Sequence, residues 1–105
     1  MERRSPAEVA DAVGPDGWRV VDDAVHARFA TGSFADGVAF TVRIGEAADA
    51  ANHHPDVTIT YPEVSVSITT HDAGGLTDLD VDMARAISSI ARDLDVAVLP
   101  DGGAR

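Results

Sequence analysis

The chain has 105 residues, with 18 acidic and 8 basic side chains, a net charge of −10 and no cysteine. This length suits one domain with one hydrophobic core, which we expect to span residues 1–105. The negative charge argues against direct binding to nucleic acid, and the lack of cysteine excludes disulfides, a thiol nucleophile and Cys-based zinc sites.

The N-terminus carries no sign of a targeting segment. The first residues, MERRSPAEV, include charges but no apolar stretch of a secretory leader, and no apolar run approaches the roughly 18 residues of a membrane span. We therefore expect a cytoplasmic protein that does not bind a membrane.

A short helix is predicted at the start of the chain. Ser5, Pro6 and Glu8 form the pattern of a capping box with proline in the first turn, and the Gly/Pro-rich residues 14–17 should end this helix. Trp18 then begins an extended segment and is expected in the core or in a subunit contact.

The next elements are a strand and a long helix. Alternating polarity over residues 25–29 predicts a strand with His26 and Arg28 on its outer face, where His26 should meet solvent. Ser33, with Asp36 at the box position, is expected to cap a helix of about residues 34–51. The core-facing stripe of that helix is predicted to be Phe34, Val38, Val42 and Ala48.

Residues 57–70 are predicted to form an antiparallel hairpin. Apolar β-branched residues alternate with polar ones, and Pro62-Glu63 divides the run. Because proline cannot adopt the positive φ of a type I′ turn, the loop is expected to be longer or bulged. The register that matches apolar residues across the hairpin pairs Tyr61 with Val64, Ile59 with Val66, and Val57 with Ile68.

Three histidines are expected to meet at the open end of this hairpin. The predicted register places His54 beside His71, and His53 is adjacent in the sequence. Imidazoles can donate and accept protons near neutral pH, so the cluster suits acid–base chemistry. A metal site is a second interpretation, although adjacent histidines seldom aim at one ion and no HxH or HExxH spacing is present. Polar residues at a strand end are the third.

A final helix is predicted after residue 77. Thr77 and Asp80 form a second capping box, and on the pattern alone Asp80 either caps this helix only or also orients a pocket histidine. Residues 96–99 form an apolar tail that could pair with another element, and residues 100–105 are expected to be frayed. The predicted core-facing stripe is Leu79, Met83, Ile87, Ile90 and Leu94.

Together these elements predict an α+β fold, an antiparallel four-stranded sheet with helices packed on one face. The specific motifs lie between positions 49 and 80. They are His53-His54-Pro55-Asp56, Tyr61, Thr70-His71, Gly75-Leu76-Thr77 and Asp80. This set resembles the pterin-4a-carbinolamine dehydratases, also called 4a-hydroxytetrahydrobiopterin dehydratases, over about the whole chain. Val57 and Thr58 stand where relatives often carry an aromatic pair, so the pocket wall is expected to differ there.

The resemblance implies a reaction and a site. Such enzymes dehydrate 4a-hydroxytetrahydrobiopterin to the quinonoid dihydropterin in tetrahydropterin recycling, without a metal or organic cofactor. The implied catalytic residues are His53, His54, His71 and Asp80, with His53 and His71 transferring protons and His54 binding the pterin. The implied substrate contacts are His53, His54, Pro55, Thr70, His71, Asp72 and Ala73, with Asp49 where relatives commonly have glutamate.

The resemblance also implies association and an alternative role. Relatives form homodimers or homotetramers, so we expect self-association. Others of this fold are non-enzymatic assembly or dimerisation partners, among them rubisco assembly factors that typically lack the histidine set. Because this chain retains all three histidines, catalysis is favoured.

Overall fold

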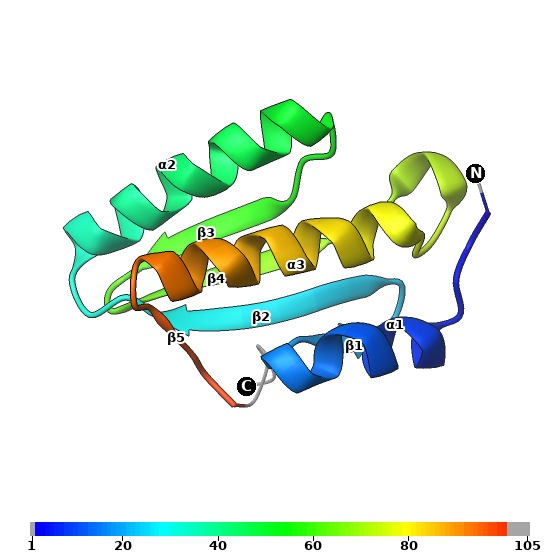
Figure 1. Ribbon diagram of the computed structural model, residues 1–105, viewed down its shortest axis with the longest axis horizontal. Coiled ribbons are helices and arrows are strands. Elements are labelled where there is room, and N and C mark those ends of the chain that lie inside the picture. Colours follow the sequence, from blue (N-terminus) through cyan, green and yellow to red (C-terminus); the bar gives the residue numbers. More distant parts are fainter. Residues whose placement is uncertain (1, 101–105) are drawn as a thin grey trace.

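The computed structural model describes residues 2–100, in which three helices cover one face of a twisted sheet (Figure 1). In chain order the elements are α1 (Pro6–Val13), the 3-10 turn η1 (Gly14–Asp16), β1 (Arg19–Val21), β2 (Ala24–Ala30), α2 (Phe34–Ala51), β3 (Asp56–Thr60), β4 (Glu63–Ile68), the 3-10 turn η2 (His71–Ala73), α3 (Asp78–Asp93) and β5 (Ala97–Val98). The α+β prediction is confirmed.

The sheet has five strands in the order β1-β2-β4-β3, and all pairs are antiparallel. The fifth strand, β5, comes from the predicted apolar tail. It pairs with Phe29 and Ala30 at the C-terminal end of β2, whereas β1 pairs with the N-terminal end of β2. Residues 101–105 of the segment expected to be frayed lie outside the described residues. Within residues 2–100, no helix combines the length and apolar character needed to cross a membrane.

The core lies between the sheet and the helices because β2 and β4 alternate as predicted. The inward face of β2 pairs with that of β4, and Phe29 packs edge-to-face on Phe40 of α2 and on Trp18, with ring centroids 5.0 and 5.8 Å apart. Trp18 is therefore a core residue, and its Nε1–H donates to Ser88 Oγ at 2.8 Å. The buried strand residues are Val25, Ala27, Phe29, Val64, Val66 and Ile68.

The outer face of β2 is less exposed than expected. His26 is half-buried, and Arg28 is only 7% exposed. The guanidinium of Arg28 makes two hydrogen bonds to the Glu63 carboxylate, at 2.6 and 2.9 Å, on the neighbouring strand β4. Long side chains on this face thus cover one another, which the polarity of a single strand does not reveal.

The predicted core stripe of α2 is wrong, although the helix itself has the predicted bounds. Phe34, Val38 and Val42 are 54, 41 and 57% exposed, and of the predicted set only Ala48 is buried. Gly37 accounts for the helix face that is turned toward the sheet. A Cβ at this position would lie only 3.3 Å from the side chains of Ile59 and Val64, so the absence of a side chain lets the helix approach closely. The helix approaches the sheet closely along the face defined by its buried residues, Gly37, Phe40, Ile44 and Ala48.

The hairpin register also differs from the prediction, by two residues. Ile59 pairs with Val64 and Val57 with Val66, across a loop of only Tyr61 and Pro62 that are joined by a cis peptide bond. The expected longer loop and the expected pair of Val57 with Ile68 are therefore wrong. A two-residue shift leaves every side chain on its predicted face, so alternation alone could not separate the two registers.

The helix starts follow the predicted capping residues. The side chains of Ser5, Ser33 and Thr77 accept backbone N–H groups at the starts of α1, α2 and α3, and the Ser5–Glu8 and Thr77–Asp80 capping boxes are complete. In α3, Met83, Ile87 and Ile90 are buried as predicted, whereas Leu79 is half-buried and Leu94 is 40% exposed.

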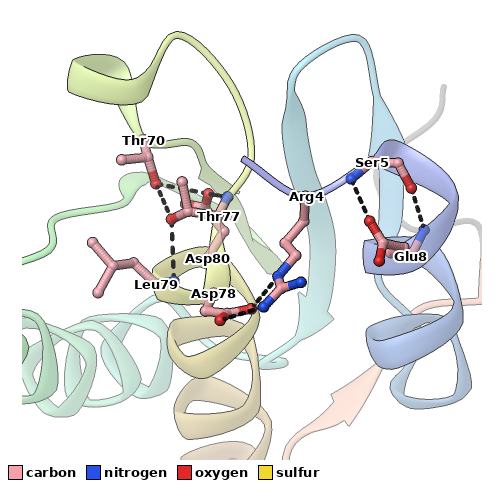
Figure 2. Close-up of polar contacts among 8 residues, drawn as sticks. All are labelled: Arg4, Ser5, Glu8, Thr70, Thr77, Asp78, Leu79 and Asp80. Carbon is pink, nitrogen blue, oxygen red and sulfur yellow. Dashed lines mark hydrogen bonds and ion pairs between the residues drawn. The ribbon is translucent and has the colours of Figure 1, made fainter. Parts of the chain in front are cut away.

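The N-terminal segment is bound to the start of α3. The backbone N–H of Arg4 donates to the Leu76 carbonyl at 2.7 Å, and its guanidinium contacts both oxygens of Asp78 at 2.8 and 3.0 Å (Figure 2). The hydrogen bond from Arg4 lowers the pKa of the exposed Asp78 carboxyl from its ordinary value of 3.8.

Phe40→Ala should lower the free energy of unfolding by about 3–5 kcal/mol, because it empties a fully buried aromatic site. Phe34→Ala on the same helix should cost less than about 1 kcal/mol, since Phe34 is more than half exposed. Urea denaturation of the two variants measures the difference. Equal losses would contradict the observed orientation of α2.

The Arg4–Asp78 contact predicts a pH-dependent contribution to stability. Because folding lowers the pKa of Asp78, the stabilisation is complete above its ordinary pKa and is lost as the pH falls through the folded value. Asp78→Asn should therefore unfold more easily than wild type at neutral pH, and the two should converge once the pH falls below the folded pKa of Asp78. Denaturation across a pH series tests this, with the exposed Asp82→Asn as a control on the same helix. A difference that persists unchanged at low pH would argue against the contact.

Candidate active site

A cavity of about 600 Å³ lies where α2 ends, β4 ends and α3 begins. Six of the predicted site residues line it: His53, His54, Thr70, His71, Asp72 and Ala73. Pro55, Asp49 and Asp80, which were also predicted, do not. The three histidines therefore share one cavity, although His54 and His71 are not cross-strand neighbours, because the regular ladder ends at Asp56 and Ile68.

Three lining residues were missed from the sequence. Asn52 was not among the predicted site residues, and Leu79 was assigned to the core stripe. Thr69, the third, precedes a predicted contact residue. The adjacency of Asn52 and Thr69 to predicted residues was the only available signal, while nothing in the helical spacing of Leu79 pointed to a cavity.

The two adjacent histidines are separated by the way α2 ends. Asn52 adopts the left-handed conformation, with φ 52° and ψ 41°, and the N–H of His53 donates to the Ala48 carbonyl at 3.1 Å. Asparagine tolerates this conformation better than most residues, and it reverses the chain at the helix end. His53 is consequently buried at 8% exposure, whereas His54 is exposed.

His71 reaches the cavity from a tight turn after β4. Thr70 and Gly75 form an isolated antiparallel β-bridge. The carbonyl of Thr70 accepts hydrogen bonds from the N–H groups of Ala73 and Gly75. Gly74 completes the turn with a φ of 72°, and its N–H donates to the His71 carbonyl. His71 is therefore held on a hydrogen-bonded turn while its side chain stays exposed.

Asp80 lies behind His53 and is fully buried. Its Oδ1 is 2.7 Å from His53 Nε2, while its Oδ2 accepts from Thr70 Oγ1 at 2.8 Å and from the Thr77 N–H at 2.9 Å. Figure 2 shows Thr70 and Thr77 converging on Asp80. Asp80 thus both caps α3 and contacts a cavity histidine. Such donors are what a carboxylate needs to offset the cost of leaving water.

His54 has a different carboxylate partner. Its Nε2 is 3.0 Å from Asp49 Oδ1, but the two side chains are 58% and 82% exposed. Water screens an exposed pair of this kind, which contributes at most about 1 kcal/mol. Asp49, a predicted substrate contact, therefore touches the cavity only through His54.

The site offers no metal-binding group and leaves no buried polar atom without a partner within residues 2–100. Within residues 2–100, no three His, Asp or Glu side chains are arranged to hold a metal ion. In the same part of the chain, every buried side-chain nitrogen and oxygen atom has a hydrogen-bond partner. The polar groups behind the cavity are thus mutually satisfied.

Asp80→Asn should lower the free energy of unfolding by about 1–3 kcal/mol, because an amide cannot accept from all the groups that face this carboxylate. Asp49→Asn makes the same chemical change in the exposed pair and should cost less than about 0.5 kcal/mol. Urea denaturation at neutral pH compares them. Equal effects would show that burial of Asp80 has no energetic consequence.

Comparisons with known proteins agree with this fold. A family model described as Pterin 4 alpha carbinolamine dehydratase matches residues 2–90. Relatives named "Putative pterin-4-alpha-carbinolamine dehydratase" occur in Thermosynechococcus vestitus, 41% identical over 86% of this chain and 96% of the relative, and in Sulfurisphaera tokodaii, 43% identical over 86% and 98%.

Two solved structures are also similar. A Brucella melitensis protein described as a transcriptional coactivator/pterin dehydratase is 32% identical, covers 86% of this chain and 99% of its own, and superposes with a TM-score of 0.78. A pterin dehydratase-like RuBisCO assembly factor of the alpha-carboxysome, 19% identical over 70% of this chain and 86% of its own with a TM-score of 0.57, shares the fold alone. On the family match and these identities, the chain belongs to the pterin-4a-carbinolamine dehydratase family.

Proposed function

We propose that this protein dehydrates a 4a-hydroxytetrahydropterin, such as 4a-hydroxytetrahydrobiopterin, to the quinonoid dihydropterin by histidine acid–base catalysis. The observation that carries the proposal is the convergence of His53, His54 and His71 on one cavity, with a buried carboxylate behind His53. Family membership supports the same reaction class. The cavity volume of about 600 Å³ is in the range that small-molecule sites occupy.

The reaction needs one proton delivered and one removed. Loss of water from a carbinolamine breaks the carbon–oxygen bond, so the leaving hydroxyl must gain a proton, and the adjacent nitrogen loses one as the carbon–nitrogen double bond forms. Two imidazoles in one cavity can supply both transfers without a metal or an organic cofactor.

His53 is suited to remove the proton. Since Asp80 Oδ2 already accepts from an O–H and an N–H, the carboxylate acts as an acceptor toward His53 as well, and Nε2 of His53 donates to it. The neutral ring then has Nδ1 as its acceptor. When Nδ1 takes a proton, the adjacent carboxylate stabilises the imidazolium, as a buried carboxylate does for histidine bases elsewhere.

We assign the remaining roles by exposure. His71 is exposed at the cavity on its own turn, which suits an acid that is reprotonated from solvent after each cycle. To His54, whose Nε2 contacts Asp49, we assign binding of the pterin. Thr70, Asp72 and Ala73 complete the proposed substrate contacts, with Pro55 and Asp49 acting from outside the lining.

The alternative is a non-enzymatic assembly or dimerisation partner of the same fold. The similar structure described as a RuBisCO assembly factor belongs to that class, but at 19% identity it carries no functional argument. Self-association remains a prediction, and the exposed Phe34, Val38 and Val42 on α2 would give a second copy an apolar surface to cover. Association alone would not require three histidines at one cavity, which is why we favour catalysis.

Purified protein should accelerate the decay of a 4a-carbinolamine, and His53→Ala and His71→Ala should each lower that acceleration by roughly 10²–10⁴-fold, the usual contribution of an acid or base. His26→Ala changes a histidine of β2 that does not line the cavity and should retain wild-type activity. Stopped-flow absorbance of the pterin measures the rates.

A wild-type protein that does not accelerate the decay of the 4a-carbinolamine would contradict the proposal and leave the partner hypothesis. Equal losses in all three histidine variants would instead point to a general loss of structure, which circular dichroism of the same samples would reveal.

A further inference from the structure

A directed chain of hydrogen bonds runs from the start of α3 to His53. We propose that Thr77 is a positioning residue, whose hydroxyl acts through Thr70 to hold Asp80 and thereby keeps Nδ1 of His53 as the proton acceptor. Thr77 is fully buried and does not line the cavity, so it cannot touch a bound ligand there. Its catalytic consequence rests on the proposed dehydration, but the hydrogen-bond chain does not.

The direction of the chain follows from counting protons. Thr70 has a single hydroxyl proton, which it donates to Asp80 Oδ2 at 2.8 Å. The contact of 2.9 Å between the hydroxyls of Thr70 and Thr77 must then be donated by Thr77. Thr77 Oγ1 in turn accepts the N–H of Leu79 at 3.2 Å. Each hydroxyl donates once. Thr77 donates to Thr70, and Thr70 donates to Asp80, so the chain of donors ends at the carboxylate.

Thr77 therefore acts on Asp80 twice. Its backbone N–H donates directly to Oδ2 at 2.9 Å, and its hydroxyl aligns the Thr70 hydroxyl that donates to the same oxygen. These two donors leave Oδ1 for Nε2 of His53 at 2.7 Å. Because Oδ1 is an acceptor, Nε2 must carry the ring proton, which selects one of the two neutral tautomers.

The other capping box in the chain shows that this arrangement is more than a helix cap. Ser5 and Glu8 make the same reciprocal pair at the start of α1, with distances of 2.9 and 3.1 Å, but both are exposed. Figure 2 places the two boxes in one view, with only the Thr77 box continuing into Thr70. Ser5→Ala is therefore a matched control that removes a cap without touching the site.

The test is the tautomer of His53 in ligand-free protein, read from ¹⁵N shifts of histidine-labelled samples and assigned with His53→Ala. Wild type should show the Nε2–H form. Thr77→Ala should shift the ring toward the Nδ1–H form and, because one ordinary hydrogen bond is lost, lower kcat about tenfold with KM unchanged. Thr77→Ser keeps the hydroxyl and should restore both readouts, while Ser5→Ala should lower Tm with neither changed.

A Thr77→Ala protein that melts at lower temperature but keeps the wild-type tautomer and kcat would overturn the proposal and leave Thr77 as a cap only. Should Thr77→Ala not fold, Thr70→Val replaces it, because it breaks the chain while leaving the capping hydrogen bonds of Thr77 in place. An unchanged His53 tautomer in Thr70→Val would overturn the proposal equally. A wild type without dehydratase activity would contradict the proposed function, and the tautomer measurement would still decide this one.

Discussion

The burial of Asp80 is the constraint on which the site depends. Among residues 2–100 it is the only buried acidic side chain, in a chain with 18 acidic residues that mostly face solvent. A carboxylate removed from water must be matched by donors, and here they come from three parts of the fold. His53 follows α2, Thr70 follows β4, and Thr77 begins α3. Asp80 therefore fixes these three segments relative to one another.

The two histidine–carboxylate pairs illustrate how burial changes the meaning of one contact. His53 with Asp80 and His54 with Asp49 have similar distances, 2.7 and 3.0 Å. In the first pair the carboxylate is inaccessible and is also bound by neighbouring donors, which is the basis of the tautomer that we propose for the imidazole. In the second, both groups are solvated and water competes for each. Adjacent residues of one type thus acquire different environments, because the chain reversal after α2 leaves His53 buried and His54 in solvent.

The scaffold itself is compatible with more than one function. One fold can carry unrelated activities, so the sheet and its helices do not by themselves specify a reaction. What distinguishes a catalytic member must lie in the side chains at the cavity and behind it. In this chain the proposed proton exchange would depend on the cavity histidines, and Thr70, Thr77 and Asp80 form a buried hydrogen-bonded network behind them.

Local sequence determined the elements, the helix caps and the faces of the strands. Ser5, Ser33 and Thr77 mark helix starts because their side chains satisfy N–H groups only two or three residues away, and strand alternation assigns a face without knowledge of the partner. The histidine set was visible for the same reason, as a short motif. Tertiary structure alone decided the hairpin register, the buried face of α2, the burial of Arg28 and the contact of Asp80 with His53. These depend on how closely distant segments approach, and several arrangements of equal local quality were available until the core and the buried carboxylate selected one.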